Sequence, residues 1–146
     1  MNVNQPGENI VSEQYDNYTD TQKEVFAIEI RKTRNKLISI AIVIFVFDLL
    51  ALLIGNALSL QTFLGILVIP VIISGLALLA VKEPLVAMII ASVIIVGIWA
   101  YTIIVIGGSA VVSGWIGKAI IIYLIISGFQ HAVEATRIKK ELKGVV

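Results

Sequence analysis

Four stretches of this sequence are long and apolar enough to cross a lipid bilayer, and they constrain the fold more than any other feature. A helix needs roughly 20 apolar residues to cross about 30 Å of hydrocarbon. We predict four spans, over residues 37–55, 62–81, 85–106 and 112–133. Ile and Val are frequent in these stretches, but helices are favoured over strands because a bilayer core has no water to satisfy free backbone groups.

The composition supports a membrane protein and excludes several other classes. Of the 146 residues, 58% are hydrophobic and only 14% are charged, whereas soluble domains carry about 25% charged residues. The net charge of +1 offers no basic surface for nucleic acid, so we expect no nucleic-acid partner. The chain has no cysteine and one histidine, which removes thiolate chemistry and leaves little for metal binding or acid–base catalysis.

Short connections between the predicted spans determine how the helices are arranged. Residues 56–61 link the first pair, residues 82–84 link the second and third, and residues 107–111 lead into the fourth. Loops of this length force consecutive helices to lie antiparallel. The predicted fold is therefore all-α: an up-down four-helix transmembrane bundle over residues 37–133.

The positive residues determine the predicted orientation. An even number of spans puts both termini and the middle connection on one side of the membrane. Ten of the eleven Lys and Arg residues fall on that side, and Lys118 is the exception. Because positive residues concentrate in the cytoplasm, we predict a multi-pass protein of the cell (inner) membrane with both termini cytoplasmic.

Two polar segments flank the spans. Residues 1–20 lack apolar periodicity, which predicts a flexible cytoplasmic tail. Thr21 and Glu24 have the spacing of a capping box, so residues 21–36 are predicted to form a basic, amphipathic juxtamembrane helix. Residues 134–146 are predicted to continue the fourth helix as a cytoplasmic helical tail.

A basic collar precedes the first span and consists of Arg31, Lys32, Arg34 and Lys36. One interpretation is that the collar fixes the orientation of the span. The other is that it binds anionic lipid headgroups or a partner, since each basic residue near a membrane surface adds about 1 kcal/mol. Both interpretations place the four side chains at the level of the lipid headgroups.

Two charged residues fall inside the predicted spans. Asp48 lies about 10 Å below the outer surface, and Lys118 lies at about 9 Å, counted from the helix ends. Charges in lipid are costly, so the two are predicted to form an intramembrane charge pair between the first and fourth helices. Tyr101 and Thr102 fall in the same layer and are possible hydrogen-bond partners. The alternative for Lys118 is that its side chain reaches outward to the headgroups.

No pattern of catalytic or metal-binding residues accompanies these charges. His131 and Glu134 have the spacing of two ligands on one helical face. A metal site would need further ligands from other helices, so we expect neither a metal nor a cofactor. The sequence also lacks a nucleophile–base set, an HExxH motif and paired aspartates, so we expect no enzyme activity.

Two resemblances bear on function. Four short spans with a carboxylate in the first are similar to the architecture of the small multidrug resistance family, in which that carboxylate is essential. This chain has Asp48, within FVFDLLALLIG, where that family has glutamate, and the family's motif around the carboxylate is absent. The four-span layout ending in HAVEATRIKKEL also resembles small uncharacterised bacterial membrane proteins, which implies a bacterial inner membrane but no activity.

Two functions follow from the sequence. The first is an accessory or interaction subunit without catalysis, in which the internal charges hold the bundle together. The alternative is a small proton- or cation-coupled transporter that uses Asp48. The expected partners are the lipid bilayer with its anionic headgroups, and either a larger membrane protein or further copies of the chain in a homo-oligomer.

Overall fold

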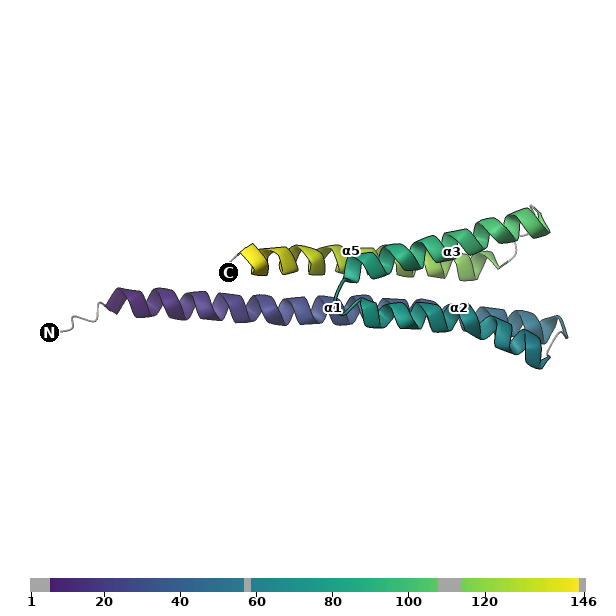
Figure 1. The fold of residues 1–146 in the computed structure, drawn as a ribbon, viewed down its shortest axis with the longest axis horizontal. Helices are drawn as coiled ribbons and strands as arrows, with labels where there is room; N and C mark the ends of the chain where they lie inside the picture. The colour runs from purple at the N-terminus through teal and green to yellow at the C-terminus, as the bar shows by residue number, and fades with distance from the viewer. Residues whose placement is uncertain (1–5, 57–58, 108–113, 145–146) are drawn as a thin grey trace.

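The computed structural model describes residues 6–56, 59–107 and 114–144, and within these residues the regular structure is all-helical (Figure 1). The helices are α1 (Pro6–Ile54), α2 (Leu60–Leu79), α3 (Pro84–Ile106) and α5 (Trp115–Gly144). Each of the four is long and apolar enough to cross a membrane. Four apolar helices are therefore present, as the sequence predicted, which suggests a small multi-pass membrane protein. Residues 112–113 of the predicted fourth span lie outside the described residues.

The helix ends follow from local chemistry. At the start of α2, the Thr62 backbone N–H donates to Ser59 Oγ at 3.1 Å, and the Ser59 N–H donates to Thr62 Oγ1 at 2.9 Å. This reciprocal capping box satisfies two backbone donors that have no partner in the helix. Pro84 occupies the first turn of α3, where a missing N–H costs nothing.

The N-terminal part of α1 differs from the prediction. Residues 6–20 are helical and continue into the rest of α1, whereas the sequence predicted a flexible tail over residues 1–20. Thr21 and Glu24 accordingly lie inside the helix and do not mark its start. Extending an existing helix adds one hydrogen bond per residue without a new nucleation cost, so a polar segment without periodicity can still be helical. Residues 1–5 lie outside the described part.

The packing of α1 against α5 and α2 organises the molecule (Figure 1). Figure 1 shows α2 beside the C-terminal half of α1, and α3 beside α5. The α1 helix begins, and α5 ends, toward the left of that view, whereas α1 ends and α5 begins toward the right. In the contacts between α1 and α5, residue numbers fall along one helix as they rise along the other. The two helices are therefore antiparallel.

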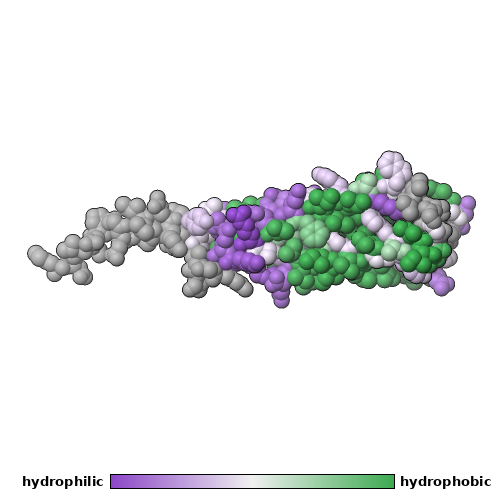
Figure 2. Space-filling view, turned by 90° about the horizontal axis from the view of Figure 1, so that it is seen from above, coloured by the Kyte–Doolittle hydropathy of each residue, from purple (hydrophilic) through white to green (hydrophobic). Residues whose placement is uncertain are grey.

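A narrow buried core lies where the four helices meet. Its members are mostly aliphatic or small, and they include Leu37, Ile40, Ile73, Ala77, Met88, Ala91, Ile95, Ile121 and Ala132. Many other large apolar side chains of the spans are exposed. Figure 2 shows these residues as green surface over the four-helix part, with purple surface where α1 and α5 continue beyond it. An apolar outer surface of this kind is suited to lipid.

Candidate functional site

A polar cluster joins α1 to α5 at one end of the apolar band; we call Glu29, Lys32 and His131 the Glu29 cluster. Glu29 Oε2 lies 2.6 Å from His131 Nδ1, and Glu29 Oε1 accepts from Lys32 Nζ at 2.7 Å. Only 8% of Glu29 is exposed. A buried carboxylate is costly unless it is paired and hydrogen-bonded, and here each oxygen has a cationic or N–H donor.

Helix geometry explains how Glu29 reaches this position. Thr33 lies one turn after Glu29, is fully buried, and its hydroxyl donates to the Glu29 carbonyl at 3.0 Å. Glu29, Thr33 and Leu37 share one face of α1, because residues four apart are neighbours on a helix. Lys32 reaches Glu29 from three residues along α1, while His131 comes from α5. The cluster therefore links two segments far apart in the sequence.

A second polar link lies close to the same end. Lys139 of α5 donates to Glu83 Oε1 at 2.5 Å and to the Lys82 carbonyl oxygen at 2.7 Å. This ion pair and hydrogen bond tie the C-terminal part of α5 to the connection between α2 and α3. Both chain segments that continue beyond the apolar band are thus held at their base by polar contacts between helices.

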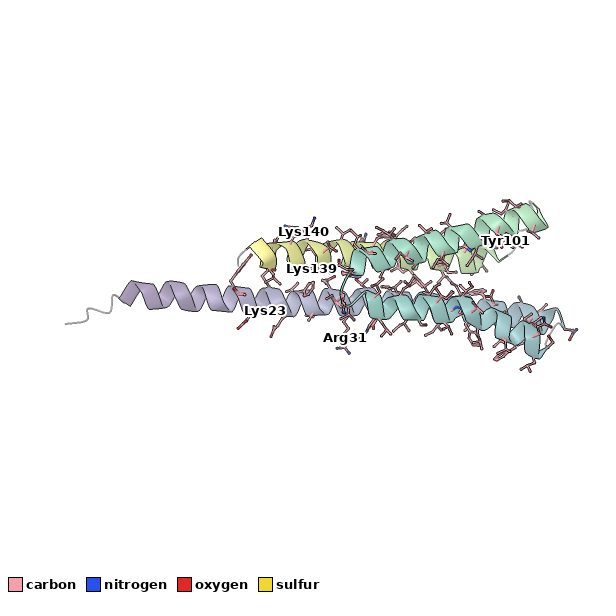
Figure 3. All side chains as sticks on the ribbon, in the orientation of Figure 1. Lys23, Arg31, Tyr101, Lys139 and Lys140 are labelled. Carbon is pink, nitrogen blue, oxygen red and sulfur yellow. The ribbon has the colours of Figure 1, made fainter. Side chains whose placement is uncertain are left out.

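The structure separates the four residues of the predicted basic collar. Lys32 is paired within the Glu29 cluster, and Lys36 Nζ lies 5.8 Å from the centroid of the Tyr123 ring, within range of a cation–π contact. Arg31 points away from the bundle at the level where α2 ends (Figure 3). Arg34 is partly buried, and its Nε has no hydrogen-bond partner among the described residues.

Small residues of α5 bring the helices close together. A Cβ placed on Gly128 would lie 2.6 Å from Met88 Cε and 3.4 Å from Lys36 Cβ. A Cβ placed on Gly117 would lie 3.1 Å from Cγ of Phe47. Helices in lipid associate through such close packing at small residues. Side chains of α1 and α3 therefore meet α5 at Gly128, with Met88 filling the space that a Cβ would take.

Asp48 and Lys118 lie at similar levels along α1 and α5. They follow Phe47 and Gly117, which face each other, so on antiparallel helices they are displaced by only about 3 Å along the axis. Both side chains are partly buried. The ion pairs between described side chains do not include Asp48 with Lys118, so the predicted charge pair stays a prediction.

Tyr101 and Thr102 have other surroundings than the sequence suggested. The Thr102 hydroxyl donates to the Ile98 carbonyl of its own helix at 2.7 Å. Tyr101, which is labelled in Figure 3, is 68% exposed. Within the described residues, no hydrogen bond joins either side chain to Asp48. Exposed aromatic rings near helix ends instead suit the membrane interface.

A double-mutant cycle tests the charge pair. Removing one partner leaves a charge in a low dielectric, whereas removing both leaves two neutral groups. We expect Asp48→Asn or Lys118→Met alone to lower the melting temperature of the purified protein. The double variant should recover most of that loss. Additive losses in thermal melts would contradict the pair, and a nearly silent Lys118→Met would indicate that Lys118 reaches outward.

The sequence reasoning missed Glu29 as the partner of His131. It considered His131 only beside Glu134, and the structure pairs Glu134 with Arg137 at 3.9 Å. The sequence did contain a signal for this contact, because Glu29 lies four residues before Thr33 and so shares the buried face of α1. An acidic residue on a buried face indicates a partner. Among the described residues, no group of three or more potential ligands is placed to hold a metal ion.

Comparison with known proteins adds no relative to this description: no family model, curated protein or solved structure matches the chain. The function is therefore argued from the geometry of the four helices and from the polar contacts at their ends.

Proposed function

We propose that the chain is a small accessory or interaction subunit of the bacterial inner membrane, without catalysis of its own. In this proposal the four helices form an up-down transmembrane bundle, and both termini lie in the cytoplasm. The concentration of Lys and Arg on that side supports the orientation. The polar parts of α1 and α5 then project from the membrane surface as a pair of helices.

The observation that carries the proposal is the length of α1. It has 49 residues and is about 73 Å long, more than twice the roughly 30 Å that a bilayer core requires. The N-terminal part of α1 continues past the end of α5 (Figure 1). We call the helix pair formed by residues 18–36 and 131–142 the stalk. A stalk held together by the Glu29 cluster presents a surface outside the membrane, as an interaction subunit requires.

Exposed apolar side chains on the stalk offer a place for a partner to dock. Val25 and Ile28 lie three residues apart on α1, and both are exposed. A partner that covers these two side chains would remove their apolar surface from water, which favours binding. Their exposure also means that polar replacements leave the packing of the bundle intact.

Co-purification tests this function. The full-length chain, cross-linked in native membranes and extracted in mild detergent, should carry a larger membrane protein in fixed stoichiometry. Changing both Val25 and Ile28 to serine should remove that protein, whereas Val93→Ser on the lipid-facing surface of α3 should retain it. Recovery of the chain alone, or a partner that both variants retain equally, would contradict the interaction role.

The alternative function is transport coupled to Asp48, and its support is the partly buried carboxylate inside the span of α1. A carrier carboxylate must bind and release protons or cations during turnover. For the interaction role, we expect liposomes containing the purified protein to show no substrate-driven proton flux that Asp48→Asn abolishes. A flux that depends on Asp48 would replace the accessory function with transport.

A further inference from the structure

Arg34 is partly buried, and one of its donors is buried without an acceptor among the residues that the structure describes. Its Nε–H has no hydrogen-bond acceptor among the described residues. Because Nε is buried, a ligand from outside the protein reaches this guanidinium through its terminal NH2 groups, for which the described residues also offer no acceptor. The arginine lies at the boundary between the polar stalk and the apolar band, where lipid headgroups are expected if the proposed membrane placement holds.

Arg31 adds a second guanidinium beside Arg34. The two residues are three apart on α1 and therefore neighbours, with Cβ atoms about 5–6 Å apart. Arg31 is exposed and points outward at the level where α2 ends (Figure 3). Among the described residues, neither arginine takes part in an ion pair or a side-chain hydrogen bond. The nearest carboxylate along α1, that of Glu29, is already occupied by Lys32 and His131.

The remaining collar lysines do not compete for the same ligand. Lys32 is bound to Glu29, and Lys36 lies over Tyr123 on the α5 side. The structure thus divides the collar into two residues engaged inside the protein and two arginines with donors to spare. A guanidinium presents a planar fork of N–H groups that matches two oxygens of a phosphate, which an ammonium group does not.

An apolar track continues from Arg34 toward the bilayer centre. Ile38 and Ile42 follow at intervals of four residues on the same side of α1, and both are exposed. The guanidinium groups suit the phosphate of a phospholipid, and the exposed aliphatic side chains beside them suit its acyl chain. The track distinguishes this ligand from a free phosphate ion, which has nothing to place on Ile38 and Ile42.

We propose that Arg34, assisted by Arg31, binds the phosphate of an anionic phospholipid in the cytoplasmic leaflet, with an acyl chain along Ile38 and Ile42. The inference rests on the proposed membrane placement of α1 but not on the identity of any protein partner. The proposal also assigns lipid binding to two residues of the collar. A diffuse basic surface, by contrast, would attract anionic lipid through all of its charges equally.

Lipid titration of the purified full-length protein in detergent tests the site. The probes are dioctanoyl phosphatidylglycerol, dioctanoyl phosphatidylcholine and glycerol 1-phosphate, and binding is followed by native mass spectrometry. We expect phosphatidylglycerol to bind most tightly. Both Arg34→Gln and Arg34→Lys should weaken it roughly tenfold, because lysine keeps the charge but loses the N–H fork. Exposed Lys140, on α5, provides the matched control, and Lys140→Gln should bind as the wild type does.

Four results would overturn the site. Wild-type affinity in Arg34→Lys contradicts the site, because that variant binds normally only if charge alone matters. Equal weakening by Arg34→Gln and Lys140→Gln would show diffuse attraction. Equal affinity for glycerol 1-phosphate would identify a free-phosphate site. If Arg34→Gln fails to fold, exposed Arg31→Gln must still weaken phosphatidylglycerol binding, and no effect there contradicts the proposal. The lipid titration uses only the purified chain and the probes. Its result therefore does not depend on whether the co-purification experiment finds a partner protein.

Discussion

Replacing Gly128 by leucine should destabilise the bundle by about 1–3 kcal/mol or more, because the side chain would enter space already filled by Met88 and Lys36. Even a Cβ at this position would lie 2.6 Å from Met88 Cε and 3.4 Å from Lys36 Cβ. Met88 is flexible and can adjust to a single methyl group, so Gly128→Ala should be milder. Thermal melts of the detergent-solubilised protein, followed by tryptophan fluorescence, measure both effects.

A glycine in an open position provides the control. A Cβ on Gly97 of α3 would meet no atom within 4 Å, so Gly97→Leu should leave the melting temperature almost unchanged. A compensating change adds a second check, since Met88→Ala combined with Gly128→Leu should recover part of the loss. Equal destabilisation by Gly97→Leu and Gly128→Leu would mean that Gly128 does not mark a close helix contact.

Replacing Glu29 by leucine should destabilise the protein by about 1–3 kcal/mol, the range for buried polar groups that lose their partners. The change leaves Lys32 and His131 without the carboxylate that each contacts within 3 Å. The α1 and α5 parts of the stalk should then separate more readily. Hydrogen exchange over residues 131–142 should therefore speed up together with the fall in melting temperature.

Exposed Glu24 on the same helix is the matched control for Glu29, and Glu24→Leu should have little effect on either measurement. A double-mutant cycle with His131→Leu isolates the contact. The two losses should be smaller together than their sum, because each single change already breaks the same hydrogen bond. Strict additivity, or equal effects of the Glu24 and Glu29 variants, would show that the Glu29 cluster does not join the helices.

The spans were predictable because the bilayer acts on each segment separately. A stretch such as residues 85–106 is identified by its own length and hydropathy, and the structure has α3 over Pro84–Ile106. The ion pairs of Arg137 with Glu134 and Glu141 were equally predictable, since they depend only on spacing within one helix.

Contacts between helices were less accessible to sequence reasoning. Pairing Glu29 with His131 requires the relative shift and rotation of α1 and α5, which are set by side-chain packing at residues such as Gly128. Counting residues from the helix ends placed Asp48 and Lys118 at similar levels, and the packing of the helices near Gly117 does the same. It could not give the direction in which each side chain points. The helical start of α1 was missed because residues 6–20 carry no periodic apolar face.

Cysteine accessibility tests the central claim, four membrane spans with both termini in the cytoplasm, most directly. The natural chain has no cysteine, so single cysteines report one position each. In spheroplasts, a membrane-impermeant maleimide should label Ser59→Cys and Trp115→Cys, which lie before α2 and at the start of α5. It should label Lys82→Cys and Lys140→Cys only after the membrane is broken. Labelling of Lys140→Cys in intact spheroplasts, with Lys82→Cys still protected, would contradict the account, because α5 would then end outside the cytoplasm.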